Sequence, residues 1–216
     1  MTMNQSRAMI GVLRLTAAAI IISSVIWLLY GSGPVYLLYF TIQSNLLGIA
    51  VLAFGGITAL TGGKLAACPR LSFIATFSLL MTMLMFWGII APSVEFELVT
   101  FVNITQHLFA PLVVILDRVL FYTGCAPTKK GALIALIHPI LFFIQAMIVG
   151  AAKLVEFPDG TRWFPYPFLD FYELGMMMPA FILVIALFMI LSASLMAWWE
   201  RRRDKKLVMR ALTRGP

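Results

Sequence analysis

The sequence predicts an all-α membrane protein with six transmembrane helices, and three observations support this fold class. Of its 216 residues, 62% are hydrophobic and only 12% are charged. A soluble domain is about half apolar and about a quarter charged, so lipid has to cover an excess of this size. The apolar residues also gather in six stretches, each near the ~20 residues that a helix needs to cross a bilayer. The sequence lacks the ten-residue segments of alternating polarity that would indicate a barrel.

The six segments follow one another through short connections. We expect helices over 9–30, 35–61, 71–92, 98–123, 131–152 and 172–199. Glycine and proline punctuate the chain between them, most clearly at Gly31–Pro34, Gly124–Pro127 and the aromatic stretch 157–170. The first segment has a longer apolar run than a signal peptide and contains Arg14, so we interpret it as a retained helix. We therefore expect one transmembrane domain over 1–216, ending in a basic tail at 200–216.

Basic residues in the short connections predict the orientation. Six crossings place both termini on one side, and this side carries most of the basic residues: Arg7, Lys64, Arg70, Lys129, Lys130 and the tail. Only Lys153 and Arg162 fall on the other side. The positive-inside rule then puts both termini in the cytoplasm. The charge of the tail, with seven of the 16 Lys and Arg residues, indicates attraction to a lipid surface and no nucleic-acid partner.

Metal and cofactor chemistry find little support in the sequence. Cys68 and Cys125 lie in separate connections that we expect to be cytoplasmic, where thiols stay reduced. The chain has two histidines and no cysteine or histidine cluster with metal-ligand spacing. We expect no metal site and no cofactor.

Among the charged groups near the membrane, we expect Arg14 to snorkel to the inner surface, and Asp117 and Arg118 to be paired or interfacial.

Two polar clusters inside the expected helices are the natural candidates for a functional site, because polar groups are costly there. The clusters are Thr41, Gln43, Ser44 and Asn45 on one helix, and Asn103, Thr105, Gln106 and His107 on another. At the α-helical rise, Thr41 lies about 9 Å and His107 about 13 Å from the same side of the membrane. The two clusters can therefore meet in the outer half. His138 lies roughly 10 Å from the inner side and next to Pro139, where we expect it to satisfy backbone exposed at a kink.

An alternative interpretation gives these polar residues no catalytic role. Threonine and serine in membrane helices often bond back to a carbonyl of the preceding turn, here that of Leu37 for Thr41. Asparagine and glutamine often join helices to one another. On composition and spacing alone, the clusters fit this structural role as well as they fit a site.

At the same residues the chain resembles a known family. Three short motifs occur in order: Tyr39-Phe40-Thr41 on the second helix, Asn103 with His107 four residues later and Pro111 beyond, and Tyr166-Pro167-Phe168-Leu169 before the last helix. Together they resemble the androgen-induced-gene family of membrane hydrolases, which includes the androgen-dependent TFPI-regulating protein, over about residues 35–175. The sequence departs from the family's pattern at Ile104, where the family has a second histidine, and at Asp117, one position later than its acidic residue.

The resemblance implies an intramembrane threonine hydrolase that cleaves fatty acid esters of hydroxy fatty acids (FAHFA) in a bacterial inner (plasma) membrane. Thr41 would be the nucleophile and His107 the base, since a threonine hydroxyl needs an adjacent base. Supporting or oxyanion candidates are Asn103, Ser44 and Asn45. The partner would be a branched lipid ester, bound in an elongated apolar pocket between the second and fourth helices. We expect the segment Phe157–Asp170 to cover it with substrate-binding candidates Arg162, Trp163, Phe164, Tyr166 and Phe168.

Three other functions stay open at this point. A small transporter would also place polar residues at mid-membrane, although no internal repeat is evident in the sequence. A haem protein would need His107 and His138 at similar depth. A lipid-binding protein without turnover is the strongest non-enzyme alternative, and release of fatty acid by the purified protein distinguishes it from a hydrolase.

Overall fold

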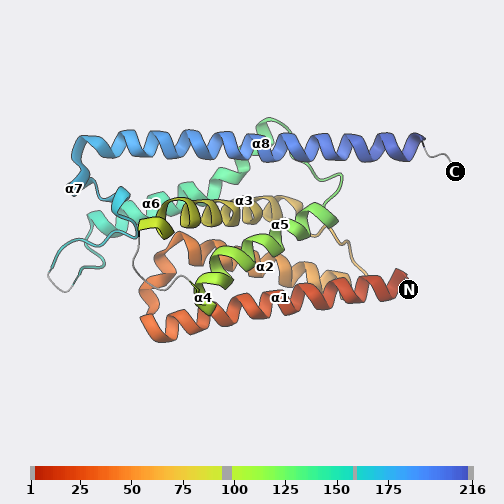
Figure 1. The fold of residues 1–216 in the computed structure, drawn as a ribbon, viewed down its shortest axis with the longest axis horizontal. Coiled ribbons are helices and arrows are strands. Elements are labelled where there is room, and N and C mark those ends of the chain that lie inside the picture. Colours follow the sequence, from red (N-terminus) through yellow and green to blue (C-terminus); the bar gives the residue numbers. More distant parts are fainter. Residues whose placement is uncertain (1–2, 94–98, 158–159, 214–216) are drawn as a thin grey trace.

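The computed structural model describes residues 3–93, 99–157 and 160–213, and it confirms the all-α membrane architecture. Six helical spans in these ranges are long and apolar enough to cross a membrane: Asn4–Ser32, Phe40–Leu60, Pro69–Ile90, Phe101–Phe121, Lys130–Ala151 and Phe171–Arg210. Each corresponds to one of the six predicted segments. The described residues form no named strand, and an isolated bridge joins Glu156 to Arg162. The first helix begins, and the last helix ends, at the same end of the bundle (Figure 1).

The helices are interrupted more often than the sequence predicts. The α-helices are α1 Met3–Ser32, α2 Phe40–Leu60, α3 Pro69–Met85, α4 Phe101–Ile104, α5 Ala110–Phe121, α6 Ile137–Ala151, α7 Phe171–Leu174 and α8 Met178–Thr213. A π-helical turn, Phe86–Ile90, extends α3, and a second π-helical turn, Thr105–Phe109, joins α4 to α5. A 3₁₀ helix, Lys130–Leu136, leads into α6. The interruptions matter here because they surround the polar residues.

Two predicted boundaries move for identifiable reasons. The second helix begins at Phe40 and not at residue 35, because Pro34 opens a 3₁₀ turn over Pro34–Leu38 and Tyr39 is extended. The tail expected at 200–216 is helical as far as Thr213, so α8 has 36 residues. At ~1.5 Å per residue it is about 54 Å long and exceeds a ~30 Å hydrocarbon core.

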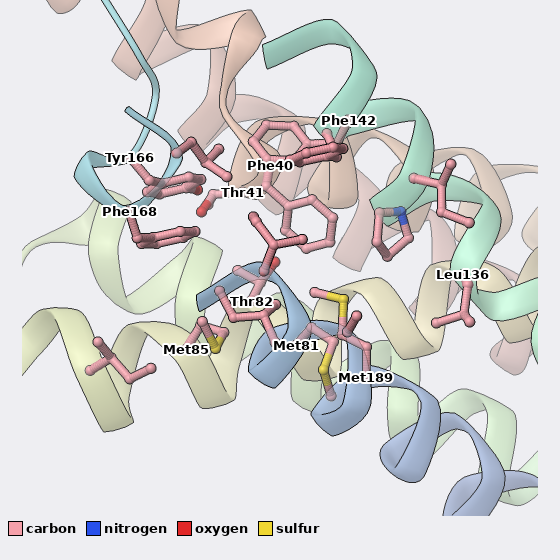
Figure 2. A pocket seen from close by; sticks show the side chains of 18 of the residues that line it. Phe40, Thr41, Met81, Thr82, Met85, Leu136, Phe142, Tyr166, Phe168 and Met189 are labelled. Carbon is pink, nitrogen blue, oxygen red and sulfur yellow. The ribbon is translucent and has the colours of Figure 1, made fainter. Parts of the chain in front are cut away.

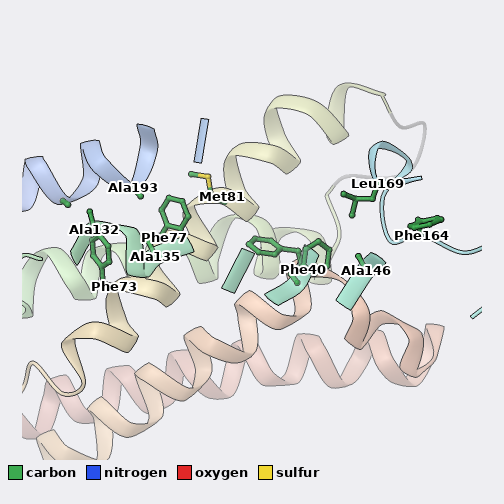
Figure 3. Packing of buried hydrophobic residues seen from close by; sticks show 12 residues of the cluster. Phe40, Phe73, Phe77, Met81, Ala132, Ala135, Ala146, Phe164, Leu169 and Ala193 are labelled. Atoms are coloured by element: carbon green, nitrogen blue, oxygen red, sulfur yellow. The ribbon is translucent and has the colours of Figure 1, made fainter. Parts of the chain in front are cut away.

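Two hydrophobic clusters share α3. In one cluster α3 packs with α1, α2 and α5, around Ile21, Leu52, Leu79 and Val114. In the other it packs with the 3₁₀ helix before α6, with α6 itself, with α8 and with the loop that precedes α7 (Figure 3). Phe40, Phe77 and Met81 belong to this second cluster. The core therefore lies along α3, with α1 and α8 on opposite sides of the bundle (Figure 1).

Glycine allows α1 and α2 to approach closely. A Cβ atom on Gly11 would lie 3.0 Å from the carbonyl oxygen of Gly56, and one on Gly56 would lie 3.0 Å from that of Gly11. Small residues at such a crossing are typical of helix pairs in membranes, where close backbone packing replaces the hydrophobic effect.

The charged residues at the end of the bundle near the termini form two buried ion pairs. Arg14 does not snorkel to the surface: its Nε lies 2.6 Å from Asp117 Oδ1, and both side chains are buried. Arg118 pairs with Glu200 of α8 at 2.6 Å, and not with Asp117. Tyr122 lies between the two guanidinium groups. Arg14 stays inside because Asp117 neutralises its charge and the carbonyls of Gly55 and Leu65 accept its remaining hydrogen bonds.

Candidate functional site

Thr41 lies in the first turn of α2, where neighbouring side chains fix its backbone. Ser44 Oγ donates to the Thr41 carbonyl at 2.9 Å, and Asn45 Nδ2 donates to the same oxygen at 2.8 Å. Asn45 Nδ2 also reaches the carbonyl of Gln106 at 3.2 Å, so it links α2 to the π-helical turn Thr105–Phe109. These bonds hold the position of Thr41 relative to the helix that carries His107.

His107 lies in that π-helical turn, and its local geometry follows from Pro111. Proline has no N–H, so Pro111 cannot donate to the carbonyl four residues earlier, which is that of His107. The indole Nε1 of Trp87 donates to this carbonyl instead, at 3.0 Å. Single π-helical turns of this kind recur at functional sites, because they displace a side chain from its regular helical position.

The hydrogen bonds of the His107 ring define its tautomer. Nδ1 lies 3.2 Å from the backbone carbonyl of Asn103, which can only accept, so Nδ1 carries the hydrogen. Nε2 then has a free lone pair, and it lies 3.4 Å from Thr41 Oγ1. The threonine hydroxyl is therefore the donor in this contact. This is the arrangement that a general base needs, at a separation typical of a site without substrate.

Aromatic contact fixes the plane of the imidazole. The Phe86 ring stacks on His107 with centroids 3.6 Å apart and an interplanar angle of 14°. Phe86 is the first residue of the π-helical turn that extends α3, so the two π-helical turns contact each other through the rings of Phe86 and His107. Neither π-helical turn could be predicted from the amino-acid sequence, although Pro111 was a signal that the helix carrying His107 is irregular.

An apolar cavity of about 320 Å³ adjoins Thr41. Its wall is formed by α2, α3 with its π-helical extension, α6 with the 3₁₀ helix before it, α8 and the loop before α7 (Figure 2). The polar groups on the described part of this wall are the hydroxyls of Thr41, Thr82 and Tyr166. The predicted position between the second and fourth helices was wrong: His107 lies behind Thr41, and the cavity lies in front of it.

The cavity reaches the outer surface of the bundle. Ile89, Ile140 and Ile190 belong to its wall, and 56%, 54% and 41% of these residues are exposed. They come from the π-helical extension of α3, from α6 and from α8. Since these residues lie on the membrane-spanning part of the chain, the rim faces lipid.

Two of the five predicted substrate-binding residues line this cavity. Tyr166 and Phe168 do so, and their rings stack on each other with centroids 5.2 Å apart. Trp163 and Phe164 are buried in the packing of the loop, Trp163 against Tyr39 and Phe164 beside Gly150. Arg162 lies over the ring of Tyr172 at 4.0 Å. These three are corrections to the prediction: alternate residues of an extended loop face opposite ways, so consecutive aromatic residues cannot all face one cavity.

The predicted oxyanion candidates also take other roles. Ser44 and Asn45 are bonded to the backbone of Thr41, behind the cavity wall, and neither lines the cavity. The contact of Asn103 with the imidazole is made by its backbone carbonyl, whereas the sequence prediction considered its amide. The sequence prediction missed Thr82 and Phe86. Thr82 Oγ1 lies 2.8 Å from Ser44 Oγ. Thr82 and Phe86 lie on α3 and its π-helical extension, which carry no polar cluster that would single them out.

His138 belongs to a separate part of the core. Its Nδ1 lies 2.8 Å from Ser78 Oγ, and its ring stacks on Phe40 at 4.6 Å. The prediction that His138 satisfies backbone exposed at a kink beside Pro139 is therefore wrong.

Comparison with known proteins identifies no relative of this chain. No protein-family model, curated protein or solved structure matches it. Among the residues that the structure describes, no group of three or more His, Cys, Asp or Glu side chains could hold a metal ion. The function has to be inferred from the site itself.

Proposed function

We propose that the chain is an intramembrane lipid-ester hydrolase in which Thr41 is the nucleophile and His107 the general base. The contact of Thr41 Oγ1 with His107 Nε2, at the wall of an apolar cavity, is the observation that supports this best. The tautomer defined by Asn103 leaves Nε2 ready to accept the threonine proton. We further propose that both termini are cytoplasmic, as the distribution of basic residues predicts.

The proposed reaction has two steps: the acyl group is transferred to Thr41, and water then releases it. The Thr41 oxygen bonds to the ester carbonyl carbon while its proton moves to His107 Nε2. Collapse of the tetrahedral intermediate breaks the bond to the alcohol, which leaves with the proton from Nε2, and an acyl-threonine remains. Water then attacks the acyl-threonine as His107 takes one of its protons, and this proton returns to Thr41 when the fatty acid leaves.

The cavity favours an ester with a long apolar chain. Its wall offers three hydroxyl groups and otherwise apolar side chains, so the reacting ester meets Thr41 at one end while hydrocarbon fills the rest. Arg162 is not part of the wall, so a free carboxylate of a branched fatty ester would lie outside the cavity. Since the rim faces lipid, the substrate would enter from the bilayer.

Turnover of a synthetic branched fatty ester by detergent-purified protein tests this function. Thr41→Ala and His107→Ala should each abolish hydrolysis, and the double variant should be no worse than either one, because residues that act as a unit are non-additive. Thr41→Ser keeps a hydroxyl and should retain some activity. His138→Ala is the matched histidine control and should keep most of it. Equal rates for wild type and Thr41→Ala would refute the assignment and favour a lipid-binding protein without turnover.

A further inference from the structure

The wall of the cavity carries a third hydroxyl that the Thr41/His107 pair does not use. Tyr166 precedes the turn Pro167–Leu169 and lies beside Thr41 on the cavity wall (Figure 2). Aromatic neighbours hold its ring from three sides: Phe168 stacks at 5.2 Å, Tyr39 meets it edge-on at 5.8 Å, and Phe142 meets it at 5.9 Å. A ring packed in this way holds its hydroxyl in place before substrate binds, so the hydroxyl need not reorganise during the reaction.

We propose that Tyr166 is a third catalytic residue, whose hydroxyl donates a hydrogen bond to the oxyanion that develops when Thr41 attacks the ester. This inference rests on the proposed function and adds the group that this function lacks. A dyad moves the proton, but the carbonyl oxygen also becomes negative and needs a donor in a medium of low dielectric constant.

The direction of the hydrogen bonds supports Tyr166 as a donor. Asn103 O accepts from Nδ1, and Nε2 accepts from Thr41, so the Thr41 oxygen still has lone pairs to accept the Tyr166 hydrogen. The Tyr166 side chain lies beside Thr41 on the cavity wall (Figure 2). Burial raises the pKa of this phenol to about 12, so it keeps its hydrogen at neutral pH.

The other hydroxyl on the wall cannot fill this role. Ser44 Oγ donates its only hydrogen to the Thr41 carbonyl, so in its contact with Thr82 it is the acceptor. The hydrogen of Thr82 is therefore already directed at Ser44, away from the cavity. Of the three hydroxyls on the described wall, Thr41 attacks, Thr82 is engaged and Tyr166 is left to donate.

During the reaction the Tyr166 hydrogen changes acceptor without leaving its oxygen. In the resting site, the proposal directs it to the neighbouring Thr41 Oγ1. When that oxygen bonds to the carbonyl carbon, the π electron pair of the C=O bond moves to the carbonyl oxygen, one bond further away. The hydrogen bond of Tyr166 follows the negative charge to this oxygen and is strongest at the tetrahedral intermediate.

Tyr166→Phe tests the proposal, with Tyr172→Phe as the matched control. The Tyr172 residue is half-exposed and lies outside the cavity wall. Loss of one oxyanion donor should lower kcat about 10²- to 10³-fold with KM little changed, whereas Tyr172→Phe should behave as wild type. A kcat for Tyr166→Phe as high as that of the control overturns the proposal.

Two inhibitors separate catalysis from cavity shape. A long-chain trifluoromethyl ketone forms a tetrahedral adduct with an oxyanion, and an ether of the same length imitates only the ground state. Tyr166→Phe should weaken binding of the ketone in proportion to kcat and leave binding of the ether unchanged. Equal losses for both would show that Tyr166 merely shapes the cavity. If Tyr166→Phe does not fold, 3-fluorotyrosine at position 166 keeps the ring and the donor, and a large fall in kcat would contradict the proposal.

The outcomes for the two proposals are distinguishable. Hydrolysis that does not depend on Thr41 overturns both. Hydrolysis that depends on Thr41 but persists in Tyr166→Phe overturns only the role of Tyr166.

Discussion

The buried pair of Arg14 and Asp117 allows a stability prediction that is independent of catalysis. Arg14 makes two contacts with the carboxylate, Nε to Oδ1 at 2.6 Å and Nη2 to Oδ2 at 3.2 Å. The side chains are only 3% and 7% exposed. Asp117→Leu leaves the guanidinium charge buried without its counter-charge, although the carbonyls of Gly55 and Leu65 still accept from it. Removing one partner of such a pair costs about 3–5 kcal/mol.

The reciprocal variant sharpens this prediction. Arg14→Met together with Asp117→Leu removes both charges and replaces them with apolar groups, which is often neutral or stabilising for a buried pair. The double variant should therefore be more stable than Asp117→Leu alone. Reversible unfolding in mixed micelles of a mild detergent and dodecyl sulfate measures the free energies of unfolding.

A surface pair provides the control for the same measurement. Lys153 and Glu156 lie 3.1 Å apart, with side chains 42% and 41% exposed. Water screens this pair, so Glu156→Gln should cost at most about 1 kcal/mol. If Asp117→Leu costs no more than Glu156→Gln, leaving the Arg14 charge buried without Asp117 does not destabilise the fold. Loss of stability in the double variant equal to the sum of the two single losses would also contradict it.

Three further predictions concern α8, the loop before α7 and the topology. Glu200→Leu should destabilise the docking of α8 by several kcal/mol and Arg118→Met/Glu200→Leu should restore it, because Arg118 makes a bidentate pair with Glu200; protease protection of α8 measures this. Gly150→Ala should displace the loop and raise KM, since its Cβ would clash with the Phe164 ring; an unchanged KM would contradict the contact. Impermeant thiol reagents outside intact cells should not label Cys68 or Cys125, but should label Tyr172→Cys, and labelling of native Cys125 would reverse the orientation.

The sequence predicts the six spans well because their cause is local. Each apolar segment is long enough to satisfy its own backbone in lipid, so composition alone is sufficient to find it. The ends are less predictable, because Pro34 and the extended Tyr39 delay α2, while α8 continues through a basic segment. The ion pairs were missed since Arg14 and Asp117 are 103 residues apart, and only packing shows that they meet.

The contact between Thr41 and His107 was within reach of sequence reasoning because it depends on depth. Both side chains lie near the start of helical segments that begin at the same end of the bundle (Figure 1), Thr41 as the second residue of α2 and His107 as the seventh residue counted from the start of α4, so they lie within a few ångströms of the same level. The chemical roles of the two residues stay a prediction. The cavity could not be placed in this way, since its position depends on which helices pack loosely, and depth carries no information about that.

The order of groups across the site gives the hydrolase proposal its physical content. Across the site, the backbone carbonyl of Asn103, the His107 ring, the Thr41 hydroxyl and the cavity follow one another. The proposed base, His107, is thus shielded from the bilayer by Phe86 and by Thr41, whereas the proposed nucleophile faces the space that an acyl chain would fill. A scaffold threonine would satisfy its hydroxyl on its own helix, but Thr41 bonds across to another helix while Ser44 and Asn45 bond to the Thr41 carbonyl. The Thr41 hydroxyl is thus left to bond with His107 at the cavity wall. A purely structural role for Thr41 does not require this arrangement.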